Sequence, residues 1–143
     1  MVKIEKALKV AWLLVGKPYI WGGDDAIKGF DCSGLIIEIL KSVGRLPRSG
    51  DWSAAMLYEK FKKHEVESPE TGCLAFWSNE NGHIIHVEFC VDFETTIGAS
   101  GGGSKTKTEQ DAIDQNAYVK VRPLEGGRKK YSHLVNPFYE DLD

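Results

Sequence analysis

The sequence predicts an α+β fold in which an antiparallel sheet packs against a helical half. Apolar residues recur with helical spacing in the first part of the chain, and from residue 64 onward the period changes to two. Helices that come first and strands that follow indicate segregated layers rather than alternating βαβ units. The length of 143 residues suits one domain with its own core, so we expect a single domain over residues 1–143.

Three helices are expected in the first half. Val2 to Val15 places its apolar residues on one helical face. Ser33 to Val43 is apolar over more than one stripe, which predicts a central and largely buried helix. A third helix, capped by Asp51 or Ser53, should run to Phe61.

The second half alternates in the way that strands do. The segment Ile84 to Val91 puts His86, Glu88 and Cys90 on one face and aliphatic residues on the other. A loop rich in glycine, serine and threonine, Gly101 to Thr108, is expected to be mobile. The four expected strands are Cys73–Trp77, Ile84–Val91, Thr95–Ala99 and Tyr118–Arg122, the last with Val119 and Val121 on its core face.

Composition excludes several classes of function. The net charge of −3 argues against binding to a nucleic acid backbone, which depends on clustered lysine and arginine. The apolar runs are far shorter than the ~20 residues of a membrane span, and the N-terminus lacks the apolar block of a signal peptide, which leaves the location open. Three cysteines do not suggest a disulfide framework. The run Arg128-Lys129-Lys130 is expected to be a solvated turn.

The most informative residue is Cys32, which stands where a loop becomes the central helix. Unpaired N–H groups and the positive end of the helix dipole stabilise a thiolate there, and they can hold an oxyanion during acyl transfer. The small neighbours Ser33 and Gly34 leave room for a substrate carbonyl. The competing interpretation is an inert core thiol, which is a common fate of a free cysteine.

A nucleophilic cysteine needs a base, and His86 is the best candidate because it shares a strand face with other polar residues. That face should look into a cleft at the helix terminus. A structural, hydrogen-bonded histidine is the alternative. His83 follows a turn, and His64 and His133 lie in polar surroundings, so surface positions are expected for them.

These residues resemble the NlpC-type cell-wall peptidases, papain-like cysteine enzymes that cut peptidoglycan stem peptides. The resemblance runs in family order from residue 17 to about residue 100, and the final third is similar to phage-encoded members. The motifs that carry it are Pro18-Tyr19-Ile20-Trp21-Gly22-Gly23, Gly29-Phe30-Asp31-Cys32-Ser33-Gly34-Leu35, Leu46-Pro47-Arg48, Gly72-Cys73-Leu74-Ala75-Phe76-Trp77 and His86-Val87-Glu88-Phe89.

The resemblance implies a papain-like fold, with Cys32 as the nucleophile and His86 as the general base. It implies that Tyr19 lines the site and donates a hydrogen bond near the oxyanion, and that Asp31 shapes the turn before the nucleophile; a plain helix N-cap is the alternative for Asp31. We also expect Trp21, with Trp52, to line the substrate groove. The implied reaction is hydrolysis of an amide in the stem peptide, commonly between γ-linked D-Glu and a diamino acid, without a metal or organic cofactor.

The chain departs from the family pattern behind the histidine. A third polar residue usually follows on the next strand and orients the imidazole, but the matching position here is Gly98. Glu88, Ser100, a backbone carbonyl or a water could substitute, or the enzyme could work as a dyad. Residues two apart stand about 7 Å apart along a strand, so Glu88 could instead bind a cationic substrate group or face solvent.

The sequence also offers four alternatives to a cysteine peptidase. A zinc site of Cys73, His83, His86 and Cys90 lacks a paired-cysteine spacing. The segment Gly98 to Thr106 narrowly misses a phosphate-binding loop, because Ser104 stands before the lysine. An amidase or acyltransferase on the same scaffold, and a non-catalytic wall-binding or phage tail module, stay open as alternatives. The expected partners are peptidoglycan stem peptides and, for a tail module, phage tail components.

Overall fold

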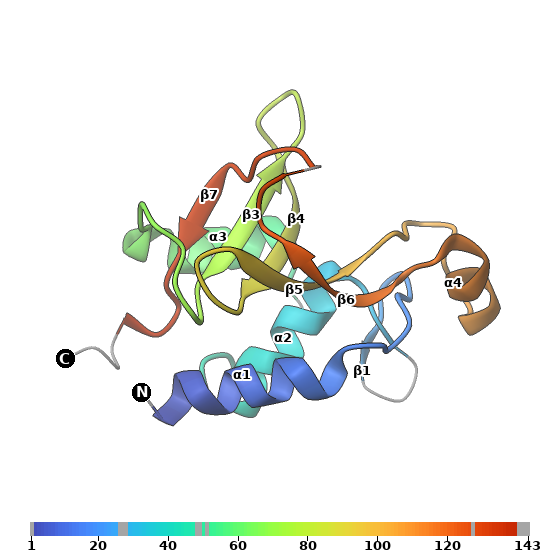
Figure 1. The fold of residues 1–143 in the computed structure, drawn as a ribbon, viewed down its shortest axis with the longest axis horizontal. Helices are drawn as coiled ribbons and strands as arrows, with labels where there is room; N and C mark the ends of the chain where they lie inside the picture. Colours follow the sequence, from blue (N-terminus) through green and yellow to red (C-terminus); the bar gives the residue numbers. More distant parts are fainter. Residues whose placement is uncertain (1, 26–28, 48–49, 51, 127, 140–143) are drawn as a thin grey trace.

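The computed structural model describes residues 2–25, 29–47, 50, 52–126 and 128–139, and its elements follow the predicted order of helices before strands (Figure 1). The helices are α1 (Val2–Leu14), α2 (Cys32–Ser42), α3 (Ala54–Phe61), the 3₁₀ turn η1 (Lys62–His64) and α4 (Glu109–Gln115). The strands are β1 (Asp24–Asp25), β2 (Gly29–Phe30), β3 (Leu74–Ser78), β4 (Ile84–Cys90), β5 (Thr95–Ser100), β6 (Tyr118–Pro123) and β7 (His133–Val135).

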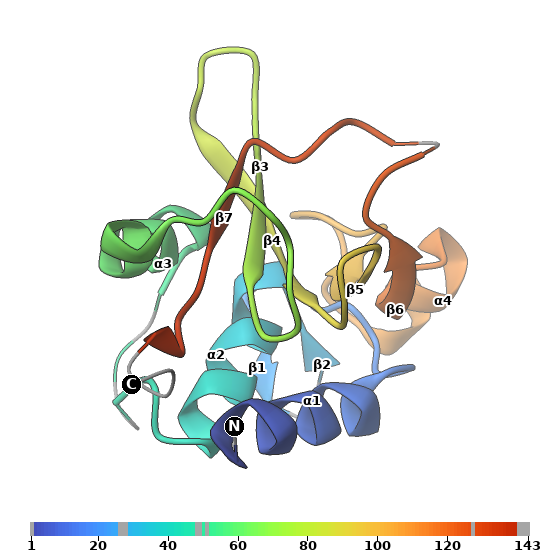
Figure 2. The ribbon, with the colours of Figure 1, turned by 60° about the vertical axis from the view of Figure 1, so that its left-hand side comes forward.

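The main sheet has the order β6-β5-β4-β3-β7, and every neighbouring pair is antiparallel. This confirms the predicted α+β class. The α3 helix contacts the central strand β4, whereas α4 lies beyond the β6 edge (Figures 1 and 2). The histidine strand β4 is therefore the central strand, with two neighbours on each side.

The predicted central helix is α2, and it is the hub of the main core. Its buried residues pack on β4 and β5, and α1 packs on α2 from the other side. From the sheet, Val87 and Phe89 on β4 enter this core with no exposed surface. None of the helices in the described ranges is long and apolar enough to cross a membrane.

The opposite face of the sheet carries a second, smaller apolar cluster. Cys90 on β4 packs there with Trp77 on β3, with Leu124 just after β6 and with Leu134 on β7. Both faces of the second half of β4 are consequently buried. A polar side chain on this half of β4 must find its partners inside the protein.

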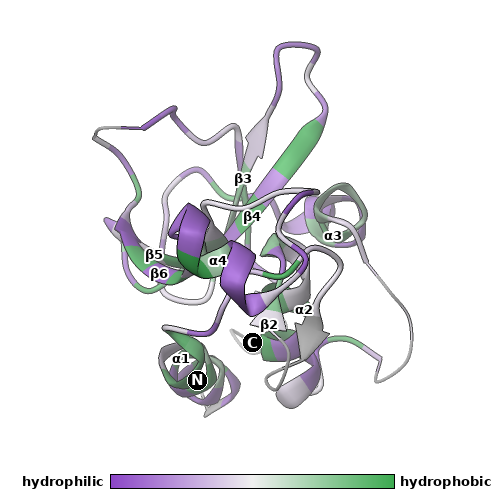
Figure 3. Ribbon diagram, turned by 90° about the vertical axis from the view of Figure 1, so that its right-hand side faces the viewer, coloured by the Kyte–Doolittle hydropathy of each residue, from purple (hydrophilic) through white to green (hydrophobic). Residues whose placement is uncertain are grey.

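Several local expectations need correction. Val119 is buried as predicted, but Val121 is 42% exposed because β6 is an edge strand. The sequence analysis missed β7 and also α4, although Thr108 and Asp111 form a reciprocal capping box at the start of α4. Figure 3 shows α4 as largely hydrophilic, which explains why it lacks a clear apolar period.

The glycine-rich loop is tethered to its surroundings at Thr106. Thr106 has no exposed surface, and its carbonyl accepts a hydrogen bond of 2.7 Å from the Trp21 amide. Its hydroxyl donates to Gln115 on α4 and accepts from the Gly103 amide. The loop also passes so close to Tyr19 that a Cβ on Gly102 would stand 2.4 Å from that ring.

The start of α2 is held by a dense set of contacts. Asp31 is the N-cap, and its Oδ1 accepts from the Gly34 amide at 2.7 Å while Oδ2 accepts from the Gly22 amide at 3.1 Å. The Asp31 amide in turn donates to the carbonyl of Gly23 at 3.0 Å. The alternative interpretation of Asp31 as an N-cap is thus confirmed, and the same carboxylate joins α2 to the Gly22-Gly23 turn.

Gly34 is required by the close approach of that turn, since a Cβ there would stand 1.9 Å from the Gly23 carbonyl oxygen. We expect Gly34→Ala to lower the free energy of unfolding by about 1–3 kcal/mol, because the turn must move away from the helix. Gly103→Ala is the matched control, since its Cβ would meet nothing within 4 Å. Urea unfolding of both variants measures the difference, and equal stabilities would contradict this account.

Candidate active site

Cys32 is the first residue of α2, at the end of the helix where backbone N–H groups are available. It is partly exposed, whereas Cys73 and Cys90 are buried in the second apolar cluster. Cys32 is therefore not a buried core thiol, whereas Cys73 and Cys90 are packing residues of that cluster.

The structure brings His86 to Cys32. Cys32 on α2 acts on the pKa of His86 on β4, so the two side chains lie close enough to interact. His86 Nε2 lies 2.6 Å from Glu88 Oε2, so Nδ1 is the ring nitrogen left for the thiol. The Trp77 ring, directly across the β3–β4 ladder, contacts the imidazole at 5.5 Å between centroids. The imidazole is thus held at Nε2 by Glu88 and against one face by Trp77.

Glu88 is fully buried and accepts hydrogen bonds from four side chains. Besides His86, the Thr96 hydroxyl donates to Oε1 at 2.6 Å, and Arg122 Nη1 to Oε2 at 3.3 Å. Arg128 donates twice, from Nη1 to Oε1 at 3.2 Å and from Nη2 to Oε2 at 3.1 Å. The expectations that Glu88 faces solvent or awaits a substrate cation are both wrong, because arginines of the chain itself occupy it.

Small neighbours on both sides make room for the Glu88 side chain. Ala75 lies opposite it on β3, and continuing the β4–β5 register places Gly98 across from it on β5. A Cβ on Gly98 would stand 2.3 Å from Glu88 Cγ and 2.5 Å from Cδ. Glu88 therefore fills the space that a side chain at position 98 would need. His86 and Glu88 are two residues apart on β4, but the long glutamate side chain spans this separation and reaches the imidazole.

The contacts set the charges of this pair. Burial alone would lower the pKa of His86, but the hydrogen bond to Cys32, with the hydrogen bond and charge of Glu88, raises the pKa to about 9. Burial alone would raise the pKa of Glu88, yet His86, then Arg128 and Thr96, lower the pKa to about 2. At neutral pH the site holds an imidazolium beside a carboxylate.

Tyr19 is a second side chain near Cys32. It is 6% exposed, and its backbone is held by hydrogen bonds to Ala117 and, through the neighbouring residue, to Phe30. Burial raises the pKa of Tyr19 above its ordinary value, and negative charge at Cys32 and Asp31 raises it further. The phenol therefore stays protonated and is a hydrogen-bond donor over the working range of pH.

A cavity of about 280 Å³ opens beside the start of α2. Ser33, which follows Cys32, lines it, and its hydroxyl lies 3.3 Å from Asp31 Oδ1, to which it donates. Trp52 lines it too, whereas Trp21, Cys32 and His86 do not belong to its lining, and Trp21 is 54% exposed. The remaining lining residues are Gly22, Gly23, Asp31, Gly34, Ser53 and Met56.

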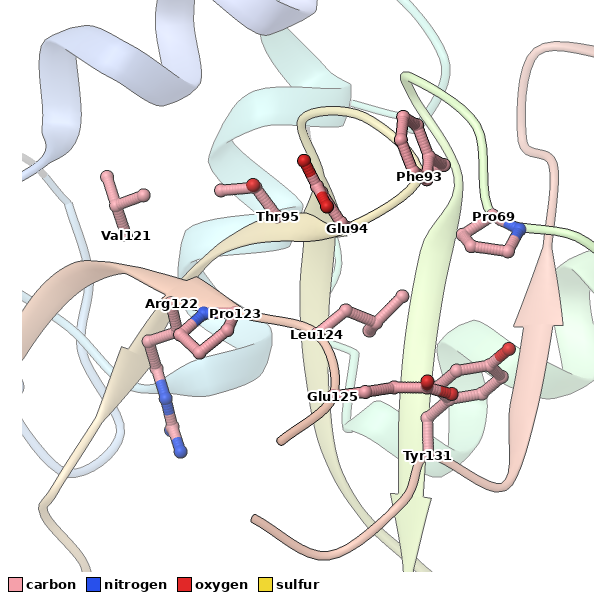
Figure 4. A pocket seen from close by; sticks show the side chains of 10 residues that line it. All are labelled: Pro69, Phe93, Glu94, Thr95, Val121, Arg122, Pro123, Leu124, Glu125 and Tyr131. Carbon is pink, nitrogen blue, oxygen red and sulfur yellow. The ribbon is translucent and has the colours of Figure 1, made fainter. Parts of the chain in front are cut away.

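Figure 4 shows another cavity, of about 660 Å³, at the β5–β6 side of the molecule. Phe93, Leu124 and Tyr131 supply much of its apolar lining. Arg122 also borders it, but its side chain extends away from Phe93 and Glu94 in this view, and its guanidinium reaches Glu88. Neither Cys32 nor His86 lines this cavity.

Other predicted site residues do not join the pair. Within the described residues, no hydrogen bond links Ser100 to His86, and Ser100 lies on β5 opposite Tyr118. The same part of the chain contains no group of three or more histidine, cysteine or acidic residues that could hold a metal ion. His83 stands at the β3–β4 turn, where its carbonyl accepts from the Asn79 amide, away from the pair.

Arg128, Arg122 and Thr96 are the functional residues that the sequence analysis missed. The expectation of a solvated turn for Arg128 is wrong, since its side chain is 9% exposed. One signal was available: an acidic residue at a strand position flanked by apolar residues needs a cation, because a buried charge is costly without a partner. No sequence pattern indicates which of the arginines meets Glu88.

Comparison with known proteins agrees with this geometry. Residues 16–123 match the model of the NlpC/P60 family. The chain belongs to the NlpC/P60 family. The matched range contains the nucleophile motif, the histidine strand and β5 with Gly98, so it covers the elements that build the site.

Relatives of this chain are named as enzymes that act on peptidoglycan. The chain is 30% identical over 133 residues to the probable peptidoglycan endopeptidase LytE of Bacillus subtilis, covering 91% of this chain and 35% of the relative. It therefore spans about a third of the length of that protein. The crystal structure of the NlpC/p60 domain of the peptidoglycan hydrolase SagA has a TM-score of 0.70 at 22% identity, over 93% of this chain and 97% of that domain.

A third neighbour shows that the fold also occurs without catalysis. RipD of Mycobacterium tuberculosis, described as a non-catalytic NlpC/p60 domain protein adapted to peptidoglycan binding, has a TM-score of 0.64 at 19% identity. The alignment covers 94% of this chain and 96% of RipD. These solved structures confirm the papain-like fold, while the activity must be argued from the site residues.

The Glu88–His86 contact predicts how stability depends on pH. His86 has a raised pKa, so its stabilising contribution is present below its ordinary value of 6.5 and is lost as pH rises through about 9. We expect the free energy of unfolding to fall over this window, and Glu88→Gln to flatten the fall. Urea unfolding at a series of pH values measures it.

The difference in pH dependence between the parent and Glu88→Gln reports on His86 and not on the thiols. Burial raises the pKa of Cys73 and Cys90 in both proteins, so their ionisation in the unfolded chain cancels. Equal pH dependence in the parent and in Glu88→Gln would show that Glu88 does not hold the imidazolium.

Proposed function

We propose that this NlpC/P60 protein is a cysteine peptidase that hydrolyses an amide bond in peptidoglycan stem peptides. The observation that carries the proposal is the alignment of three side chains. Cys32 at the start of α2 lies next to His86, and buried Glu88 binds Nε2 of that imidazole. Such a nucleophile, base and orienting group are what acyl transfer requires. The substrate class comes from the names of the relatives, LytE among them.

The reaction follows from the positions of these groups. Transfer of the Cys32 thiol proton to His86 Nδ1 gives the imidazolium described above, and the Cys32 sulfur attacks the amide carbonyl to form a tetrahedral intermediate. The helix N-terminus and the protonated Tyr19 hydroxyl supply hydrogen bonds to the oxyanion. The imidazolium then protonates the leaving amine, and the thioester forms. His86 next removes a proton from water, which hydrolyses the thioester and restores the thiol.

Glu88 serves as the orienting residue in this proposal, in place of a polar side chain at position 98. Its bond to Nε2 selects the tautomer that presents Nδ1 to the sulfur, and its charge stabilises the imidazolium that forms. Asp31 acts on the backbone instead, because its carboxylate braces the turn that precedes the nucleophile. Ser33 donates to that same carboxylate, so we assign it to the turn rather than to the oxyanion.

The bond between γ-linked D-Glu and a diamino acid is the finer proposal for the substrate. An amidase or acyltransferase would use the same catalytic groups and differ in its products. The non-catalytic interpretation depended on the missing side chain at Gly98, and Glu88 now fills that space. A single domain over residues 1–143, a phage origin and tail partners stay predictions.

Cys32→Ala should abolish digestion of purified peptidoglycan, with a loss of at least about a thousandfold, because no other group can form the thioester. Released amine groups measure the rate, and mass spectrometry of the products identifies the bond. Iodoacetamide reports on Cys32 in the parent, since Cys73 and Cys90 are buried. Digestion by Cys32→Ala at the parent rate would overturn the proposal, and wall binding by the parent without released amines would favour the non-catalytic function.

Gly98→Ala tests the orienting role without changing a polar group. Its Cβ would stand 2.3 Å from Glu88 Cγ, so the carboxylate must leave His86. We expect kcat/KM to fall by about 100-fold, as for other small misplacements of a catalytic group. Gly103→Ala is again the control. A parent-like rate in Gly98→Ala would show that His86 works without Glu88.

A further inference from the structure

Arg128 lies in the segment between β6 and β7 and reaches the site from the sheet face opposite α2. Its guanidinium makes two bonds to the Glu88 carboxylate, one to each oxygen. It also donates to the Pro123 carbonyl at 3.2 Å. With a side chain that is 9% exposed, it is closed off from a substrate in the groove. Any contribution to catalysis must therefore pass through Glu88.

The position of Arg128 is set from a second side. Its guanidinium carbon lies 4.1 Å from the centroid of the Trp77 ring, close enough for a cation–π contact. The Trp77 indole N–H donates to the carbonyl of Lys129 at 2.8 Å, and the Lys129 ammonium donates to the Ser78 carbonyl at 2.5 Å. The same Trp77 ring contacts His86. One aromatic ring thus locates both the base and the arginine.

Charged and polar groups from four strands and helices surround His86 and Glu88. On His86, the facing groups are Cys32 from α2 and Glu88 from β4. On Glu88, they are His86, Arg128, Arg122 from β6 and the Thr96 hydroxyl from β5. Arg122 makes one hydrogen bond at 3.3 Å and its side chain is 30% exposed. Arg128 makes two shorter hydrogen bonds and its side chain is only 9% exposed, so Arg128 is the closer and more buried cation.

We propose that Arg128 is a positioning residue for the catalytic base: by binding both oxygens of Glu88 it aims the carboxylate at His86 Nε2 and offsets part of its negative charge. The inference rests on the proposed function and extends it to a residue outside the groove. A carboxylate without this counter-charge would hold the imidazolium too tightly, and the imidazolium would give its proton less readily to the leaving amine. A carboxylate free to turn would leave the ring unaligned.

The test follows the imidazole C–H signals of His86 by NMR as pH is raised, together with the pH profile of kcat/KM on purified peptidoglycan. Arg128→Met should move the His86 midpoint and the alkaline limb upward by about one pH unit, because a positive charge near the imidazolium is lost. Glu88→Gln should move both downward. Arg128→Lys keeps the charge but loses the second bond, so kcat/KM should fall by about tenfold with the midpoint near that of the parent.

Lys129→Met is the matched control, since Lys129 ties the same segment to Ser78 but does not touch Glu88. If Arg128→Met shifts neither the midpoint nor the profile, and loses only the stability that Lys129→Met loses, Arg128 is a structural anchor and the inference is wrong. Should Arg128→Met fail to fold, a parent-like kcat/KM in Arg128→Lys would overturn it. An unactivated thiol in the parent, with alkylation of Cys32 unchanged by His86→Ala, would instead reject the proposed function itself.

Discussion

The buried negative charge of Glu88 is the constraint on which the site depends. A carboxylate without solvent is costly, and it persists where cations and hydrogen-bond donors surround it. Here the donors come from four places in the chain: β4 itself, β5, β6 and the segment before β7. The outer strand and a long connection are thereby tied to the central strand by charge as well as by backbone pairing.

In the proposed mechanism, this arrangement moves the orienting role from position 98 on β5 to Glu88 on β4. The family pattern leads one to expect the orienting side chain on β5, where this chain has Gly98. The absence of a side chain there is what admits Glu88 from β4, because even one added carbon would meet it at 2.3 Å. A catalytic position can thus be defined by the space beside the imidazole rather than by a place in the sequence.

The nucleophile side of the site is built on a different principle. Cys32 depends on backbone geometry: the N-cap carboxylate of Asp31 binds the Gly22 and Gly34 amides and presses α2 against the Gly22-Gly23 turn. One half of the site is held by a helix end and the other by a buried ion network. The NlpC/P60 neighbour RipD, described as non-catalytic, shows that this fold alone does not secure activity. The residues that surround the imidazole are therefore the part of the molecule to examine.

The sequence by itself determined the order of helices and strands, the place of Cys32 at a helix start and the pairing of Cys32 with His86. These are local properties, since periodicity, capping residues and strand alternation act over a few residues. The sequence did not indicate the contact between Glu88 and Arg128. The two residues lie 40 positions apart and come together only when the segment after β6 folds over the sheet. The tertiary structure decided that contact, and with it the burial of Glu88, because the energy of a buried charge depends on every group around it and not on its neighbours along the chain.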